Sequence, residues 1–422
     1  MHLCAPLRLK NAMNTGLRKD ANEIIQSAIQ AVLPDAAVRR ALKQFRPGPG
    51  RTVLVAIGKA AWQMASAAVM AVPDLAEGIV ITKYGHVKAP LPGIACYEAG
   101  HPIPDENGFA ATEKVLDLVK PLGKDDTVLF LVSGGGSALF ESPLVSAEEL
   151  QDITKQLLAC GADITEMNTI RKRLSKVKGG KFAQMAAPAK VFTIVLSDII
   201  GDPLDMIASG PAYPDTSTCA QALDIVKHYD LKMSEEGMAL LSVETPKVLD
   251  NVETCVTGSV KELCHAAEKA CRNLGYDPVI LTDELCCESS EAGRFLAGIL
   301  RTHAGKGKKT AFIAGGETVV HLKGNGKGGR NQELALAAAE RIAGLENAAI
   351  FSVGSDGTDG PTDAAGGYAD GDTCRELAEK GIRIREVLAR NDAYHALASI
   401  GNLIITGPTG TNVNDVTVGL IR

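Results

Sequence analysis

A chain of 422 residues is too long for one ordinary hydrophobic core, so we expect two domains. The formal net charge of −6 argues against a nucleic-acid or anionic-membrane partner, because an acidic surface attracts neither polyanion. The ten cysteines include no C-x-x-C pair and no histidine at zinc spacing, which argues against a zinc module and favours reduced thiols in a cytoplasmic protein. No apolar run approaches the roughly 18 residues of a membrane span.

The N-terminal region is basic. Its first nineteen residues contain four basic residues and no acid. A tail before the first helix explains this composition, and a mitochondrial transit peptide is the alternative. Apolar residues at helical spacing then predict two consecutive helices over 21–42.

The first strand is predicted over 52–57 and runs through Gly58 and Lys59 into a helix over 60–70. Lys59 therefore stands at the carboxyl end of a buried parallel strand, where open α/β sheets bind ligands. The alternative for Lys59 is a solvated residue at the start of the helix.

The next strongly buried strand is predicted over 128–132, after shorter strands at 78–81 and 94–97. It ends in a turn composed of Ser133, Gly134, Gly135, Gly136 and Ser137. Consecutive backbone N–H groups in such a turn form a concavity that binds anions. Neither serine fits the G-x-S-x-G pattern, so phosphate binding is favoured over a hydrolase nucleophile.

Positive charge is concentrated in one segment, where six cations occupy the eleven positions 171–181. In a helix, Arg171, Ser175 and Lys178 would share one face. A charged face in contact with solvent is the plain explanation. A nucleic-acid patch is disfavoured because aromatic residues are missing from the segment. We interpret the segment as binding a small anionic substrate.

Acidic residues follow the predicted central strand at 191–196. Asp198 stands at its end and Asp202 comes shortly afterwards. Carboxylates at a strand end suit a Mg²⁺ ion that is held by one or two protein oxygens plus phosphates. Each aspartate taken alone could instead be a turn or cap residue.

A glycine-dense loop, 324–331, lies between predicted strands at 311–314 and 319–322 and an alanine-rich helix at 333–342. Four of the six positions 324–329 are glycine, so the N–H groups at the helix N-terminus are open to an anion. Lys327 and Arg330 add two positive charges. We interpret this loop as a polyphosphate cradle, with a flexible surface turn as the alternative.

The same loop fits the dinucleotide pattern G-x-G-x-x-G at Gly324, Gly326 and Gly329. The acid expected about 20 residues later, which would bind the ribose, is missing. This gap weakens a dehydrogenase hypothesis.

Two later predicted strands, 351–353 and 403–406, also end in polar loops. The first loop carries Asp356 and Asp359, and the second runs from 407 to 415 with small polar donors and one acid. An EF-hand is excluded because the glutamate at loop position twelve is absent. Basic groups, aspartates and anion-binding turns without a covalent nucleophile are what phosphoryl transfer needs, so the residues favour an ATP-dependent kinase or ligase.

A series of motifs then follows one order along the chain. It comprises Lys59 in Ile-Gly-Lys-Ala, 133–137, Lys178-Gly179-Gly180, Ser197-Asp198, 201–203, 207–211, Gly316-Glu317-Thr318, 328–333, 356–363 and 409–415. From about Leu17 to its end, the chain thereby resembles the glycerate 2-kinase family with the MOFRL C-terminal domain, whose members often carry the label hydroxypyruvate reductase. Residues before Leu17 would then be a wrongly assigned start.

The resemblance implies two α/β domains with the active site in a cleft between them. These are a Rossmann-like, three-layer N-terminal domain over 17–245 and a C-terminal α/β domain over 246–422, with the MOFRL region at about 310–418. It also implies transfer of the ATP γ-phosphoryl group to D-glycerate with Mg²⁺, most simply giving 2-phosphoglycerate. The oligomeric state stays open, with a homodimer as one option.

The resemblance matches Lys59 and Arg330 to the family's active-site lysine and arginine, which would neutralise the transferring phosphoryl group. Asp198 or Asp202 would hold Mg²⁺, and Asp356 or Asp359 would accept the hydroxyl proton. Phosphate or carboxylate binding is expected from 133–137 and from Arg171, Lys178, Gly179, Gly180, Glu317, Gly326, Gly328, Gly329, Asn331 and Asn412. Lys181 stands where the family pattern leads us to expect arginine, which puts a bidentate carboxylate contact there in doubt.

Two other functions are compatible with parts of this pattern. An NAD(P)H-dependent hydroxypyruvate reductase would need a nicotinamide site, against which the missing ribose acid counts. A sugar-acid binding protein would need no cluster of aspartates. Glycerate phosphorylation accounts both for the missing ribose-binding acid and for the cluster of aspartates.

Overall fold

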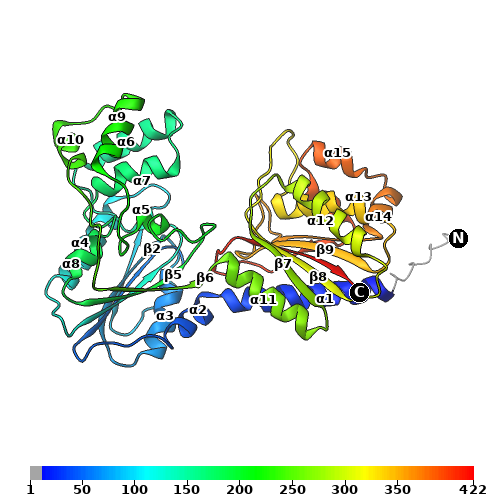
Figure 1. The fold of residues 1–422 in the computed structure, drawn as a ribbon, viewed down its shortest axis with the longest axis horizontal. Helices are drawn as coiled ribbons and strands as arrows, with labels where there is room; N and C mark the ends of the chain where they lie inside the picture. Colours follow the sequence, from blue (N-terminus) through cyan, green and yellow to red (C-terminus); the bar gives the residue numbers. More distant parts are fainter. Residues whose placement is uncertain (1–11) are drawn as a thin grey trace. The chain divides into compact units, whose positions relative to one another are not determined.

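The computed structural model describes residues 12–422, which form two compact units (Figure 1). The first unit described here comprises 34–257, and the second comprises 12–33 together with 258–422. Residues 1–11 of the predicted tail or transit peptide lie outside the described residues. Helix α1 (Ala12–Val32) begins well before the predicted position 21.

The 34–257 unit is built on a six-stranded sheet in the order β3-β2-β1-β4-β5-β6. Its strands are β1 (Thr52–Ile57), β2 (Leu75–Lys83), β3 (Ile94–Ala99), β4 (Thr127–Val132), β5 (Lys190–Leu196) and β6 (Val252–Gly258). The first five run parallel to their neighbours. This is the order of a doubly wound Rossmann sheet, and it reverses between β1 and β4. Ligands of such sheets bind beyond the strand ends at this reversal.

Alternating side chains of these strands enter two different cores. On one face, Val53 and Val55 pack with α4 (Glu106–Val119) and α8 (Lys181–Ala186). On the other face, Leu54 packs with α2 (Pro34–Ala41) and α3 (Ala61–Ala71). The predicted three-layer α/β architecture is therefore confirmed for this unit.

Four helices of the same unit form a separate small core, and they are α6 (Ala147–Ala159), α7 (Ile164–Arg173), α9 (Cys219–Tyr229) and α10 (Glu235–Leu241). Helix α7 ends at Arg173, so Ser175 and Lys178 lie beyond it. The expectation that Arg171, Ser175 and Lys178 share one helical face is therefore wrong.

The second unit has a mixed six-stranded sheet in the order β11-β10-β9-β12-β8-β7. Its strands are β7 (Asp277–Leu285), β8 (Thr310–Gly316), β9 (Ala348–Gly354), β10 (Gly366–Asp370), β11 (Leu403–Ile404) and β12 (Asp415–Ile421). Strand β12 runs antiparallel between β8 and β9, and Asp415 pairs with both Gly316 and Gly354. The ends of β8 and β9 therefore meet the start of β12 at one edge.

This second sheet is also covered on both faces (Figure 1). Helices α1 and α11 (Val260–Asn273) pack on one face against Ile313 and Phe351. The other face is covered by α12 (Ser289–His303), α13 (Arg330–Ile342), α14 (Thr373–Glu379), α15 (Ile384–Ala389) and α16 (Ala393–Ser399). Helix α1 thus belongs to the unit of 258–422, whereas the domain limits drawn from the sequence place it with the preceding domain.

Some local predictions differ from the structure. Residues 319–322 form no strand, and only an isolated bridge joins Val319 to Glu288. The strand predicted over 403–406 ends at Ile404. Among residues 12–422, no helix combines the length and apolar character that crossing a bilayer needs.

Candidate functional site

In the 34–257 unit, the strand ends at the topological reversal are joined by hydrogen bonds. The Lys59 N–H donates to the Gly134 carbonyl at 2.9 Å. The Ser133 hydroxyl accepts from the Ala60 N–H at 3.1 Å and donates to the Ile57 carbonyl at 3.2 Å. Lys59 is half-buried, and its ammonium group forms no ion pair with any residue of 12–422. The predictions that Lys59 and the 133–137 turn each follow the end of a buried strand are therefore confirmed, and the structure shows that these two strands are neighbours.

Two glycines of the turn allow side chains to approach it closely. A Cβ atom on Gly135, whose φ is +84°, would lie 2.9 Å from His101 Cδ2 and 3.2 Å from Lys59 Cγ. A Cβ atom on Gly134 would collide with the Asp198 carboxylate. Lys59, His101 and Asp198 therefore surround the same turn, and the place of His101 was not foreseen from the sequence.

The two predicted magnesium ligands differ in their surroundings. Asp198 follows β5 and is half-buried against Gly134. Asp202 has a left-handed backbone, with a φ of +50°, and its buried Oδ1 atom has no hydrogen-bond partner within 12–422. Within the same residues, no three acidic, histidine or cysteine side chains form a ready ligand set. An oxygen donor at each aspartate fits a hard cation that keeps water or phosphate as its remaining ligands.

The cation-rich segment 171–181 is largely neutralised inside the unit. Lys172 Nζ lies 3.0 Å from Asp215 Oδ1, and Arg173 Nη2 lies 3.3 Å from Glu244 Oε2. The Lys172 and Arg173 side chains are 3% and 0% exposed. A charged solvent face is thereby excluded for these two residues, because both cations are buried and paired.

Lys178 has a structural environment too. Its fully buried ammonium lies 2.8 Å from Glu141 Oε2 and donates to the carbonyls of Ser137 at 2.8 Å and Phe140 at 3.1 Å. Burial lowers the pKa of Lys178 to about 8 despite the Glu141 carboxylate. Two hydrogen bonds and an ion pair hold this fully buried ammonium, so the predicted direct contact with substrate does not fit. Lys178 instead holds the backbone that follows the glycine turn.

Other predicted residues of this region also have partners. The N–H groups of Gly179 and Gly180 donate to the carbonyls of Ser209 at 3.0 Å and Gly210 at 2.7 Å. The expectation that both amides bind an anion is therefore not supported by their bonding. Arg171 is half-buried, and its Nη2 lies 3.4 Å from the Ser137 carbonyl. Arg171 thus lies against the 133–137 turn. It has no carboxylate partner within 12–422, so its charge is not balanced there as those of Lys172 and Arg173 are.

In the second unit, Arg330 begins α13 and is held by two carboxylates. Its Nε and Nη2 atoms lie 2.6 and 3.1 Å from the two oxygens of Asp415. Its Nη1 atom lies 2.7 Å from Glu317 Oε1. Burial opposes the charge, yet Asp415 raises the pKa of Arg330, so the guanidinium stays protonated. Asp415 was missed as a site residue because only its register opposite Gly316 and Gly354 brings it there.

The glycine-dense loop before Arg330 uses its amides within the protein. The N–H groups of Lys323 and Gly324 donate to Asn391 Oδ1 at 2.7 and 3.1 Å. The N–H of Gly326 donates to the Arg390 carbonyl at 2.9 Å, and that of Lys327 donates to Asp392 Oδ1 at 3.0 Å. The prediction of an open polyphosphate cradle over 324–331 is therefore wrong for the amides of Gly324, Gly326 and Lys327.

Two N–H groups at the N-terminus of α13 are likewise bonded within the protein, to the carboxylate of Asp359. Asp359 Oδ1 accepts from the Asn331 N–H at 3.1 Å, and Oδ2 accepts from the Gln332 N–H at 2.9 Å. Burial raises the pKa of Asp359 to about 7, although these two N–H groups oppose the rise. Asp359 therefore caps the helix where Gly329, a residue without a side chain, stands at the N-cap.

The remaining predicted residues divide between surface and core. Asp356 is half-buried and accepts from the Thr358 N–H at 2.9 Å, while Glu317 and Asn412 are exposed. Asn331 is only 1% exposed, and its side-chain amide is bonded to Asp359 and Ser352. Asp356 is thus more accessible than Asp359, which is 3% exposed.

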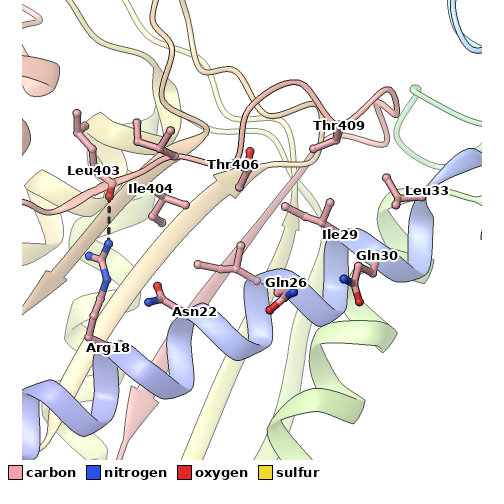
Figure 2. Close-up of a pocket in the computed structure, with 12 residues that line it drawn as sticks. Arg18, Asn22, Gln26, Ile29, Gln30, Leu33, Leu403, Ile404, Thr406 and Thr409 are labelled. Atoms are coloured by element: carbon pink, nitrogen blue, oxygen red, sulfur yellow. Dashed lines mark hydrogen bonds between the residues drawn. The ribbon is translucent and has the colours of Figure 1, made fainter.

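A groove in the second unit is lined by none of these residues. Figure 2 shows it between α1 and the segment 403–409, with Asn22, Gln26 and Gln30 along the helix. Its volume is about 600 Å³. Among residues 12–422, Arg18 is the only charged residue that lines it, and it donates to the Leu403 carbonyl at 3.0 Å. Such a lining offers little to a polyphosphate, and no predicted site residue contributes to it.

The fold and the strand-end groups define the class as a two-domain α/β protein. Family models match at residues 20–242, described as Domain of unknown function (DUF4147), and at residues 310–415, described as the MOFRL family. The D-glycerate 2-kinase of Thermotoga maritima is 51% identical over 96% of this chain and 98% of its own length. The glycerate 2-kinase of Pyrococcus horikoshii is 39% identical over 96% of this chain and 97% of its own length.

Solved structures agree with these relatives. The crystal structure of a glycerate kinase from Thermotoga maritima has a TM-score of 0.94 at 51% identity and covers 97% of this chain and 100% of its own. Two proteins of Agrobacterium vitis that are 40% identical carry the provisional name hydroxypyruvate reductase. The chain belongs to the glycerate 2-kinase family with a MOFRL C-terminal domain.

The buried pair Lys178–Glu141 leads to a prediction about stability. Lys178→Met removes the cation and leaves Glu141 buried without a partner, which typically costs about 3–5 kcal/mol. Lys176→Met is the matched control, because Lys176 pairs with Glu113 where both side chains are 39% and 42% exposed. We expect the control to lose less than about 1 kcal/mol. Urea unfolding of both variants measures the difference, and equal losses would contradict the structural role of Lys178.

Asp359 leads to a prediction about pH. Its folded pKa of about 7 lies above that of an unfolded aspartate, so its stabilisation is complete below about pH 4 and is lost as the pH rises through 7. Asp359→Asn cannot ionise, so its cost in unfolding free energy should be smaller at about pH 8 than at about pH 5. Urea midpoints at both pH values provide the measurement. Asp363→Asn is the control, because Asp363 is exposed and the Tyr394 hydroxyl lowers its pKa. The cost of this substitution in unfolding free energy should not become smaller between about pH 5 and about pH 8.

Proposed function

We propose that the protein is a glycerate 2-kinase, which transfers the γ-phosphoryl group of ATP to the 2-hydroxyl of D-glycerate. The observation that carries this proposal is Lys59, whose ammonium has no ion pair within 12–422 and whose Cγ atom lies beside Gly135 of the 133–137 turn, at the reversal of a Rossmann-order sheet. Family membership with relatives named for this reaction supports it. Phosphoryl transfer needs a cation and backbone donors at such a place, because negative charge on the phosphoryl oxygens must be neutralised.

Lys59 and the turn would bind phosphate oxygens in this proposal. Arg171 would add a second cation on the Ser137 side. Asp198 and Asp202 would hold Mg²⁺, which when bound neutralises charge on the β- and γ-phosphates. Asp198 would then act beside Gly134, and Lys59 beside Gly135.

In the second unit, Arg330 would bind an oxyanion of a reactant. A guanidinium has five N–H donors, and three of the Arg330 donors are bonded to Asp415 and Glu317. The other donors can bind an oxyanion while Asp415 holds the planar group in place. Asp356 would accept the proton of the glycerate hydroxyl, since Asp359 is committed to the helix cap. A cytoplasmic location accords with this small-molecule chemistry.

The function is tested by supplying D-glycerate with ATP and Mg²⁺ in one reaction and hydroxypyruvate with NADH in another. We expect ADP release with D-glycerate and no NADH oxidation. Phosphorus–proton coupling in the product's NMR spectrum distinguishes 2-phosphoglycerate from 3-phosphoglycerate. NADH oxidation without ADP release would refute the kinase proposal and support the hydroxypyruvate reductase.

Lys59 leads to a prediction about catalysis. Lys59→Met removes a cation from the phosphoryl oxygens, so we expect kcat to fall by roughly two to three orders of magnitude. Its melting temperature should stay unchanged, because the ammonium has no ion pair within 12–422 to lose. Lys124→Met, at an exposed loop position of the same unit, is the matched control and should keep the activity. If the Lys59→Met variant were fully active, or if it unfolded, the proposed catalytic role of Lys59 would be refuted.

A further inference from the structure

A histidine outside the predicted site lies against its glycine turn. His101 belongs to the connection between β3 and α4. A Cβ atom on Gly135 would lie 3.0 Å from its Nε2 atom and 2.9 Å from its Cδ2 atom, so this edge of the ring faces the turn. Lys59 Cγ approaches the same point at 3.2 Å. A glycine at 135 is therefore what admits both side chains.

The surroundings of His101 are rich in cations. Burial lowers the pKa of His101, and Lys59, Lys83 and His86 lower it further, so the imidazole is neutral near pH 7. The His86 Nδ1 atom lies 2.9 Å from the Lys59 carbonyl, which ties this neighbour to the same strand end. Glu98 interacts electrostatically with His86, and its carboxylate accepts from the Val87 N–H at 2.9 Å. Lys59 and Lys83 have no carboxylate partner among residues 12–422.

The ring nitrogens of His101 are available for binding. Within the part of the chain that the structure describes, neither nitrogen forms a hydrogen bond. A neutral imidazole offers one N–H donor and one acceptor. A half-buried ring with two unused nitrogens, which approaches Gly135 together with an unpaired lysine, has no evident structural purpose.

We propose that His101 is a further ligand-contacting residue, whose Nε2–H donates a hydrogen bond to the oxyanion held by Lys59 and the 133–137 turn. The ligand class is a phosphoryl or carboxylate group of a reactant. This proposal rests on the proposed function and extends it to a residue of the β3–α4 connection.

A neutral donor is well suited to this position. Lys59 and Lys83 already supply positive charge, and a third full charge beside them would be repelled when no anion is bound. The imidazole N–H adds a directional hydrogen bond to a charged acceptor without that repulsion. It therefore fixes the orientation of an oxyanion that a lysine attracts only as a point charge.

Two substitutions of His101 test the proposal. His101→Ala removes the donor, and we expect kcat/KM to fall roughly ten- to a hundredfold, the effect of losing a hydrogen bond to a charged group. His101→Gln can place an amide N–H close to the position of Nε2, so it should stay within about threefold of the wild type. Melting temperatures of both variants report on folding.

His228→Ala is the matched control, because His228 is an exposed histidine of the same unit. It should keep the wild-type kcat/KM. An alanine variant of His101 as active as this control would overturn the proposal. A glutamine variant as impaired as the alanine variant would also overturn it, since the group would then be needed for its basicity.

Calorimetry with ADP and with D-glycerate, each added alone, identifies the source of the oxyanion. Weaker ADP binding by His101→Ala assigns the contact to a nucleotide phosphate, and weaker D-glycerate binding assigns it to the carboxylate. Unchanged affinity for both ligands would overturn the proposal. These binding data do not depend on turnover, so absence of glycerate phosphorylation by the wild type would refute the proposed function while leaving the His101 contact to be judged by affinity.

Discussion

The candidate groups of both units depend on one constraint, which is that strand ends align along an edge of a hydrogen-bonded sheet. In the 34–257 unit, parallel pairing places the ends of β1 and β4 side by side. Lys59 and the 133–137 turn must then be neighbours, because each follows its strand directly. In the second unit, β12 runs in the opposite direction to β8 and β9, so its first residue, Asp415, meets their last residues. Register therefore determines which charges meet.

The distribution of ion pairs separates structural cations from functional ones. Lys172, Arg173 and Lys178 are buried and each lies against a carboxylate. A buried charge is tolerated only with such a partner, since desolvation otherwise disfavours the charged form. Lys59 has no partner within 12–422 and keeps part of its surface exposed. Its charge is thus available to an incoming anion, whereas the charges of the other three are already balanced.

Much of the α/β architecture could be predicted because buried parallel strands are continuous apolar runs, as at 52–57 and 128–132. Strand β12 was not predicted, although Val416 and Val418 are fully or almost fully buried. Its alternation is short, and its place in the middle of a sheet follows from pairing with β8 and β9. The glycine loop before Arg330 was misjudged for a similar reason. Its amides bond to residues more than sixty positions later, which local composition does not reveal.

The end of the first strand also bears on the choice between kinase and reductase. A dinucleotide-binding turn after β1 needs glycines in the pattern G-x-G-x-x-G, so that backbone and helix approach the pyrophosphate. Beginning that pattern at Gly58 would require glycine at 60 and 63, where the chain has Ala60 and Gln63. Strand β2 ends in Lys83 instead of the acid that binds a ribose hydroxyl. The turn with close backbone approach follows β4 instead, beside an unpaired lysine. That arrangement favours a transferring phosphoryl group over a nicotinamide dinucleotide.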